Sequence, residues 1–216
     1  MKLYLSSYKL GDKTEELKRW IAEHNNKICL IPNSRDVFPD GERKVTGIQE
    51  DVKDLEDLGF DVTVISLKDY FNRKEDLSKR LEEFNAFYVI GGNTFALRQA
   101  MYLSGFDKYL KSVEDKPDYL YAGYSAGICV LAKDMHGLDV CDDPSINPYG
   151  IETIWEGLGY FDYIFLPHYK SNHKETKLID DSVEYCNKNN IKYRTLRDGD
   201  VIIADTCKSI EQEEER

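Results

Sequence analysis

The sequence lacks a long uninterrupted apolar run. A membrane-spanning helix needs about 18 consecutive apolar residues, and polar or charged residues interrupt every apolar stretch of this 216-residue chain well before that length. The N-terminal residues 1–7 are also too short and too interrupted for a secretory signal peptide, and we expect them to contain the first strand. We therefore expect a cytoplasmic protein that does not bind a membrane.

Cysteine is sparse, and histidine is sparser still. The chain has five cysteines and four histidines, and no C-x-x-C pair occurs. Such scattered cysteines predict neither a zinc knuckle nor a disulfide framework. We expect free thiols in a reducing compartment, and neither a metal nor another cofactor.

Positive charge is in the minority. The chain has 29 Lys and Arg against 40 Asp and Glu, a net charge of −11. Because nucleic-acid phosphates would be repelled, nucleic acid is not an expected partner. The clearest acidic run, at residues 211–216, is expected to be a solvated tail that follows a single domain at residues 1–210. The oligomeric state is left open, with a homodimer as one option.

Short apolar segments alternate with segments of helical periodicity. Candidate strands span residues 2–6, 28–32, 61–65, 86–90, 119–124, 163–166, 193–196 and 201–204. Candidate helices between the earlier strands span residues 14–23, 44–58, 74–84 and 94–103. This alternation predicts a single α/β domain with a mostly parallel sheet flanked by helices on both faces. Sites in such sheets lie at the carboxyl ends of the strands.

The segment Gly123-Tyr-Ser-Ala-Gly127 follows one of these strands and precedes a helical turn at residues 128–132. Strand, tight turn and helix are the setting in which G-x-S-x-G forms a nucleophile elbow. The glycines permit a strained turn that presents the Ser125 hydroxyl, and the Ala126 N–H at the helix start can stabilise an oxyanion. The structural alternative is a serine that only caps the helix. We predict that Ser125 is a catalytic nucleophile.

A second glycine turn ends the strand at residues 86–90. Gly91 and Gly92 allow the backbone to approach a ligand closely, and the Gly92 N–H can be the second oxyanion donor. A common strand-to-helix loop, capped by Asn93 or Thr94, is the alternative. Neither G-x-G-x-x-G nor a P-loop motif is present here, which disfavours dinucleotide or nucleotide binding.

A serine nucleophile needs a base and an orienting carboxylate. His168 follows the strand at residues 163–166 and so belongs to the same edge of the sheet, with His173 as the reserve candidate. The loop between Ser125 and His168 carries three carboxylates from which the acid is expected: Asp139, Asp142 and Asp143.

These motifs resemble those of a known family, the peptidase E (aspartyl dipeptidase) family of serine peptidases, over most of the chain. The segments that carry the resemblance are Gly91-Gly-Asn-Thr-Phe95, Gly123-Tyr-Ser-Ala-Gly127, Asp142-Asp-Pro144, Leu166-Pro-His-Tyr169 and Glu175-Thr-Lys177. The resemblance implies a fold like that of class I glutamine amidotransferases, with serine in place of their cysteine. It also implies hydrolysis of dipeptides with an N-terminal aspartate, through an acyl-enzyme.

Carried over by position, the resemblance makes Ser125 the nucleophile, His168 the base and Asp142 the acid. Gly92 and Ala126 become the oxyanion donors. These assignments describe a Ser-His-Asp triad whose acid precedes the histidine in the chain.

The expected substrate contacts are Lys177 and Asn93. The aspartate-specific member of the family has arginine where this chain has Lys177, and the loop from Pro144 to Gly159 is longer than in the family pattern. Both departures concern the choice of substrate more than the reaction.

Other functions fit the same motifs. A cyanophycinase-like hydrolase of β-aspartyl peptides would use the same triad, whereas a glutamine amidotransferase would need cysteine at position 125. A catalytically silent, ligand-binding member of the fold is a further alternative. For the enzyme, we expect a small peptide as substrate.

Overall fold

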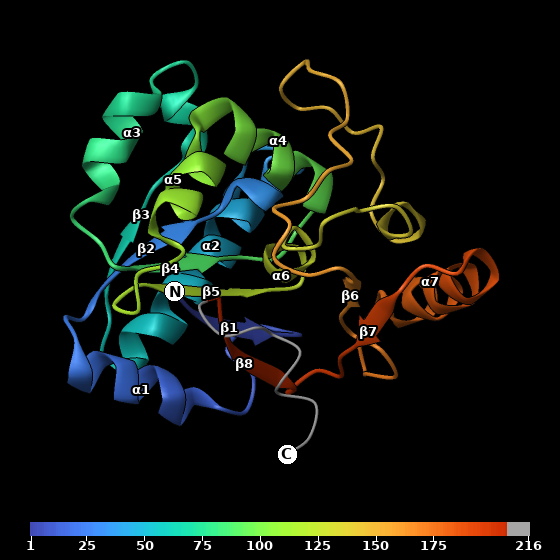
Figure 1. Ribbon diagram of the computed structural model, residues 1–216, viewed down its shortest axis with the longest axis horizontal. Helices are drawn as coiled ribbons and strands as arrows, with labels where there is room; N and C mark the ends of the chain where they lie inside the picture. Colours follow the sequence, from blue (N-terminus) through green and yellow to red (C-terminus); the bar gives the residue numbers. More distant parts are fainter. Residues whose placement is uncertain (207–216) are drawn as a thin grey trace.

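A central sheet of six strands organises the computed structural model, which describes residues 1–206 (Figure 1). The strand order is β3-β2-β4-β5-β1-β8, and every neighbouring pair is parallel except β1 and β8. These strands are β1 (Lys2–Ser6), β2 (Lys27–Ile31), β3 (Asp61–Val64), β4 (Ala86–Val89), β5 (Leu120–Tyr124) and β8 (Val201–Asp205). The predicted acidic tail at residues 211–216 lies outside the described residues.

Two further strands form a small parallel sheet beside the central one. They are β6 (Ile164–Leu166) and β7 (Tyr193–Thr195). The Sγ of Cys129 donates a hydrogen bond to the carbonyl of Phe165 at 3.4 Å, which ties β6 to the short helix after β5. All the strands predicted from the sequence are therefore present.

Helices cover both faces of the central sheet, as predicted (Figure 1). They are α1 (Thr14–Glu23), α2 (Glu42–Leu58), α3 (Lys74–Leu81), α4 (Thr94–Ser104), α5 (Phe106–Val113), α6 (Ala126–Cys129) and α7 (Thr176–Asn189). Alternate residues of each strand join different cores: Tyr4 packs in the core that receives α1 and α2, and Leu3 in the core that receives α3, α4 and α5. Within residues 1–206, no helix has the length and apolarity needed to cross a lipid bilayer.

Two helices differ from the sequence prediction. α6 ends at Cys129 instead of continuing to residue 132, because the chain beyond it forms a bridge between Ala132 and Phe161. α5 was not predicted, although its buried residues have helical spacing: Phe106, Tyr109, Leu110 and Val113. Gly105, with φ 83°, ends α4 and separates the two helices.

The strands β1 and β5 lie side by side but lead to opposite faces of the sheet. The helix after β1 packs in one core, whereas the helix after β5 packs in the other. A crevice forms at the carboxyl end of parallel strands where consecutive connections diverge in this way. The residues that follow β1 and β5 are therefore placed together at the expected position of a site.

Candidate active site

Ser125 occupies a sharp turn between β5 and α6. Its backbone has φ 50° and ψ −118°, a conformation that residues other than glycine rarely adopt. Its side chain makes no capping hydrogen bond to α6. The structure therefore has the strained strand-to-helix geometry of a nucleophile elbow and not that of a serine helix cap.

The glycines on either side of Ser125 permit close packing of the elbow against β4. A Cβ added to Gly127 would lie 2.2 Å from the carbonyl oxygen of Val89, and one added to Gly123 would lie 2.9 Å from the same atom. Because the obstructing atom belongs to the backbone, no side-chain rotation relieves the overlap. The G-x-S-x-G pattern is thus a packing requirement of this turn.

The predicted oxyanion donors lie on two loops that touch. A Cβ on Gly91 would approach the Cβ of Ser125 to 3.0 Å, so the Gly91–Gly92 turn lies directly against the elbow. Within residues 1–206, neither the Gly92 N–H nor the Ala126 N–H donates a hydrogen bond to another backbone carbonyl. Both amides are therefore without a backbone acceptor close to the serine, and their role as oxyanion donors stays a prediction.

The loop after β2 supports the Gly91–Gly92 turn from behind. The Ser34 hydroxyl lies 2.8 Å from the Ile90 carbonyl oxygen and 3.0 Å from that of Gly91, and its one proton can be donated to either. A Cβ on Gly92 would lie 2.4 Å from the Ser34 carbonyl oxygen. These contacts fix the direction of the Gly92 amide.

Asn93 caps α4. Its side-chain oxygen accepts a hydrogen bond from the Ala96 N–H at 2.9 Å, and its amide donates to the Asp143 carbonyl at 3.1 Å. The side chain is buried and serves the loop structure, while its expected contact with substrate stays a prediction.

His168 pairs with a carboxylate outside the three that were predicted from the sequence. Its Nδ1 lies 2.7 Å from Oδ1 of Asp198, and the imidazole is 2% exposed. His168 follows β6, and Asp198 follows β7. Because β6 and β7 are parallel neighbours, their carboxyl ends meet. The sequence predicted both strands but not that they pair, so it gave no signal for Asp198.

Asp142, expected as the acid, is placed elsewhere. Its Oδ2 accepts a hydrogen bond at 2.8 Å from the Thr94 N–H at the start of α4, and no hydrogen bond or ion pair joins it to His168. Burial raises the pKa of Asp142 to about 6. Asp139 and Asp143 accept from the backbone amides of Gly137 and Ser145 in local turns. The structure therefore corrects the predicted partner of His168 from Asp142 to Asp198.

The ring of Tyr8 connects the histidine to the elbow. Its centroid lies 5.7 Å from the His168 ring and 6.0 Å from the ring of Tyr124, the residue before the serine. Tyr8 follows β1, and its side chain is 40% exposed. Ser125, His168 and Tyr8 thus gather at the carboxyl ends of β5, β6 and β1.

His173, the reserve base, stacks on His168. The ring centroids are 3.8 Å apart with an angle of 11° between the planes. Burial, followed by the neighbouring His168 charge, lowers the pKa of His173. His173 therefore favours the neutral form of its imidazole beside His168.

Three groups here could in principle hold a metal ion. Ligand atoms of His168, His173 and Glu175 all lie within 4.8 Å of one another. Imidazole nitrogen lone pairs lie in the ring plane, however, and nearly parallel stacked rings do not aim them at a common point. As arranged, the cluster is a poor chelator, and a ring would have to turn for metal binding.

Lys177 lies on the exposed first turn of α7. The preceding Thr176 donates a hydrogen bond through Oγ1 to the His168 carbonyl at 3.0 Å, so the start of this helix is attached to the site. Within residues 1–206, no carboxylate forms an ion pair with Lys177. The lysine follows the residue that binds the His168 carbonyl, and its contact with substrate stays a prediction.

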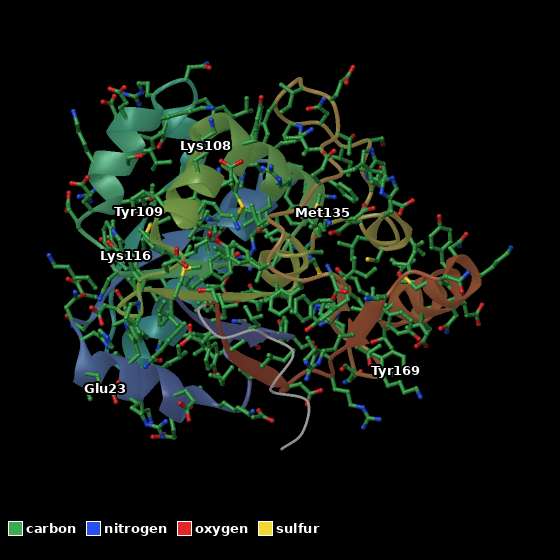
Figure 2. The ribbon with its side chains drawn as sticks, viewed as in Figure 1. Glu23, Lys108, Tyr109, Lys116, Met135 and Tyr169 are labelled. Atoms are coloured by element: carbon green, nitrogen blue, oxygen red, sulfur yellow. The ribbon has the colours of Figure 1, made fainter. Side chains whose placement is uncertain are left out.

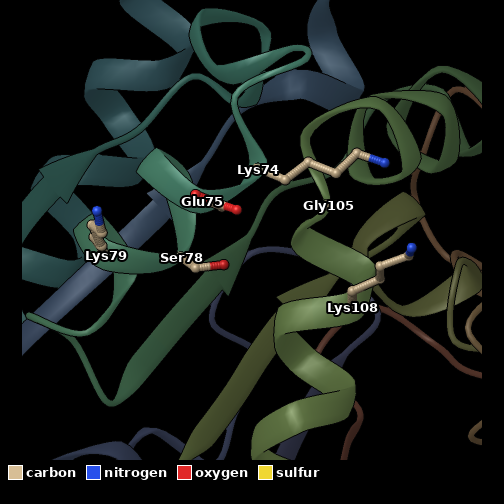
Figure 3. A pocket seen from close by; sticks show the side chains of 6 residues that line it. All are labelled: Lys74, Glu75, Ser78, Lys79, Gly105 and Lys108. Atoms are coloured by element: carbon tan, nitrogen blue, oxygen red, sulfur yellow. The ribbon is translucent and has the colours of Figure 1, made fainter.

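A surface cleft of about 360 Å³ lies away from this chemistry. Figure 3 shows the residues that line it: Lys74, Glu75, Ser78, Lys79, Gly105 and Lys108. Lys108 lies on α5, and Figure 2 places it far across the molecule from Tyr169, the residue after His168. No residue of the candidate site lines the cleft.

Several known proteins are similar to this chain in sequence. Residues 4–208 match the sequence profile of peptidase family S51. An uncharacterized peptidase of Listeria innocua is 28% identical over 144 residues, which are 67% of this chain and 65% of that protein. Peptidase E of Streptomyces coelicolor is 30% identical over 151 residues, 67% of this chain and 56% of that protein. The aligned part thus spans less than two thirds of either relative.

Solved structures share the fold. The crystal structure of a peptidase E candidate from Listeria monocytogenes matches with a TM-score of 0.72 at 21% identity and covers 94% of this chain and 98% of that one. A peptidase from an acI-B1 actinobacterium matches with a TM-score of 0.65 at 16% identity, covering 94% and 83% of the two chains. These similarities confirm the predicted α/β fold.

Proposed function

Because this chain belongs to peptidase family S51, we propose that it is a serine peptidase that hydrolyses small peptides through an acyl-enzyme. The nucleophile is Ser125, the base is His168, and Asp198 is the carboxylate that orients the base. The observation that carries the proposal is the 2.7 Å contact between His168 Nδ1 and Asp198 Oδ1. A silent binding protein has no need of an imidazole that a carboxylate orients at the strand ends where the elbow serine also lies.

Each group has a defined task. With Nδ1–H donated to Asp198, the neutral imidazole has its lone pair on Nε2, which takes the Ser125 proton as the hydroxyl attacks the peptide carbonyl. The Gly92 and Ala126 amides stabilise the oxyanion of the tetrahedral intermediate. The imidazolium then protonates the leaving amine, and a water molecule, activated by the same nitrogen, hydrolyses the acyl-enzyme.

The proposed substrates are dipeptides with an N-terminal aspartate. Lys177, on the first turn of a helix joined to His168 through Thr176, supports this choice as a local positive charge on an acidic protein. A lysine is a point charge and lacks the planar fork of arginine. We therefore expect the preference for aspartate to be loose.

A fluorophosphonate probe tests the nucleophile without knowledge of the substrate. The wild-type protein should be labelled at Ser125, Ser125→Ala should not be labelled, and the control Ser112→Ala, on α5, should be labelled like wild type. Labelling that persists in Ser125→Ala, or a wild-type protein that does not react, would overturn the proposal. A panel of α- and β-aspartyl dipeptides then separates the dipeptidase from a cyanophycinase-like hydrolase.

A further inference from the structure

Ser7 is a fully buried serine at the end of β1, beside the catalytic histidine. In the parallel pairing of β1 with β5, Ser6 stands opposite Tyr124, so Ser7 is next to the elbow. Its exposed fraction is 0%. None of the motifs singled out in the sequence includes it.

The Ser7 hydroxyl contacts both members of the His168–Asp198 pair. Its Oγ accepts the His168 backbone N–H at 2.9 Å and lies 3.1 Å from Oδ1 of Asp198. A third contact, to the Leu196 carbonyl, is longer at 3.3 Å. A hydroxyl has one proton to donate, and the charged carboxylate is the stronger and closer acceptor.

The two bonds act on different parts of the pair. His168 has a left-handed backbone with φ 64°, unusual for histidine, and the Ser7 oxygen holds its N–H in that conformation. The Asp198 oxygen that receives the Ser7 proton is the same Oδ1 that receives Nδ1–H of His168. One hydroxyl thus fixes the histidine backbone and the position of the carboxylate oxygen.

We propose that Ser7 is a positioning residue of the site, whose hydroxyl sets the alignment of His168 with Asp198. The expected effect of Ser7 on catalysis rests on the proposed function. The alignment itself is a property of the folded protein.

Ser7→Ala tests the role, with Ser104→Ala as the matched control. Ser104 is also fully buried, accepts a backbone N–H (from Phe106) and donates to a carbonyl (of Ala100), but it lies at the end of α4. The measured quantity is the second-order rate constant of fluorophosphonate labelling. Ser7→Ala should be slower by about 10²-fold, whereas Ser104→Ala should react at the wild-type rate even if its melting temperature falls equally.

A double-mutant cycle distinguishes positioning from general structural damage. Because the alignment that Ser7 sets is that of His168 with Asp198, Ser7→Ala should cost less in the Asp198→Asn background than in the wild type. A Ser7→Ala penalty that multiplies in full with that of Asp198→Asn would show an independent structural effect and overturn the proposal.

A spectroscopic readout separates this inference from the proposed function. In proton NMR, the Nδ1–H of His168 should resonate far downfield because of its carboxylate partner. The signal should move or broaden in Ser7→Ala and stay unchanged in Ser104→Ala. If the wild type is not labelled, the peptidase proposal fails while this signal still decides the role of Ser7. An unchanged signal in Ser7→Ala overturns the positioning role, whatever the labelling shows.

Discussion

Asp198 and His168 lie 30 positions apart in the sequence, yet Oδ1 of the first is 2.7 Å from Nδ1 of the second. The contact exists because β6 and β7 run parallel and end at the same edge of their small sheet. It gives the proposed triad the chain order Ser125, His168, Asp198. Asp142, by contrast, belongs to the start of α4.

Replacing the two carboxylates by amides should have very different effects on activity. Asp198→Asn should lower kcat by about 10⁴-fold, because an amide in this position favours the wrong imidazole tautomer. Asp142→Asn should retain most of the activity, because its oxygen can still accept the Thr94 N–H. Dipeptide hydrolysis by the two folded variants decides the matter, and the reverse ranking would restore Asp142 as the acid.

Asp142 should make stability depend on pH. Its pKa of about 6 in the folded protein exceeds the ~3.9 of an unfolded aspartate, so the folded state holds this proton more tightly. Binding of this proton therefore adds its full contribution to the free energy of unfolding below about pH 4. The contribution is lost as the pH rises through about 6.

Asp142→Asn removes the charge that is costly to bury. Compared with wild type, it should be more stable by roughly 2–3 kcal/mol at pH 7 and similar at pH 4. Urea unfolding at both pH values measures this, with Asp139→Asn as the control from the neighbouring loop. A difference from wild type that is the same at both pH values would contradict the assignment.

The elbow should tolerate no side chain at Gly127. Gly127→Ala places a Cβ 2.2 Å from the Val89 carbonyl oxygen and should reduce the free energy of unfolding by about 1–3 kcal/mol or more, with loss of fluorophosphonate labelling. Gly41→Ala is the control, because a Cβ there meets no atom within 4 Å. Equal stability and labelling in the two variants would mean that the turn is not packed as described.

Lys177 should govern the preference for aspartate. Lys177→Met should raise KM for Asp-Leu while leaving the hydrolysis of Ala-Leu unchanged, a loss of uniform binding, and Lys177→Arg should keep or sharpen the preference. The ratio of kcat/KM for Asp-Leu to that for Asn-Leu measures the effect. Lys188→Met, in the last turn of the same helix, controls for the loss of one positive charge. An unchanged ratio in Lys177→Met refutes this specificity assignment and leaves the triad untouched.

The fold could be predicted from the sequence because its signals are local. Strand runs such as residues 119–124 are apolar and end in glycine turns, and α1 was predicted with its observed bounds, Thr14–Glu23. Gly59 adopts the left-handed conformation expected of a helix C-cap, with φ 108°. Helix α5 was missed although its apolar spacing was present, because it follows α4 with only Gly105 between them.

The sequence could predict only those site residues whose position follows from a single strand. Ser125 and His168 each follow a predicted strand, so the strand pattern alone places both residues at the carboxyl ends of strands. The partner of His168 depends on which strand lies beside β6, and this is a tertiary fact. Ser7 could not be predicted either, since a serine after a strand has no distinctive pattern and its role comes from the two groups packed against it.

The most direct test of the central claim is kcat/KM for dipeptide hydrolysis by Ser125→Ala, compared with wild type and Ser112→Ala. Circular dichroism should first establish that all three proteins are folded. If Ser125 is the nucleophile of the triad, kcat/KM should fall by at least about 10³-fold in Ser125→Ala alone. Hydrolysis by folded Ser125→Ala at a rate close to that of wild type would contradict it.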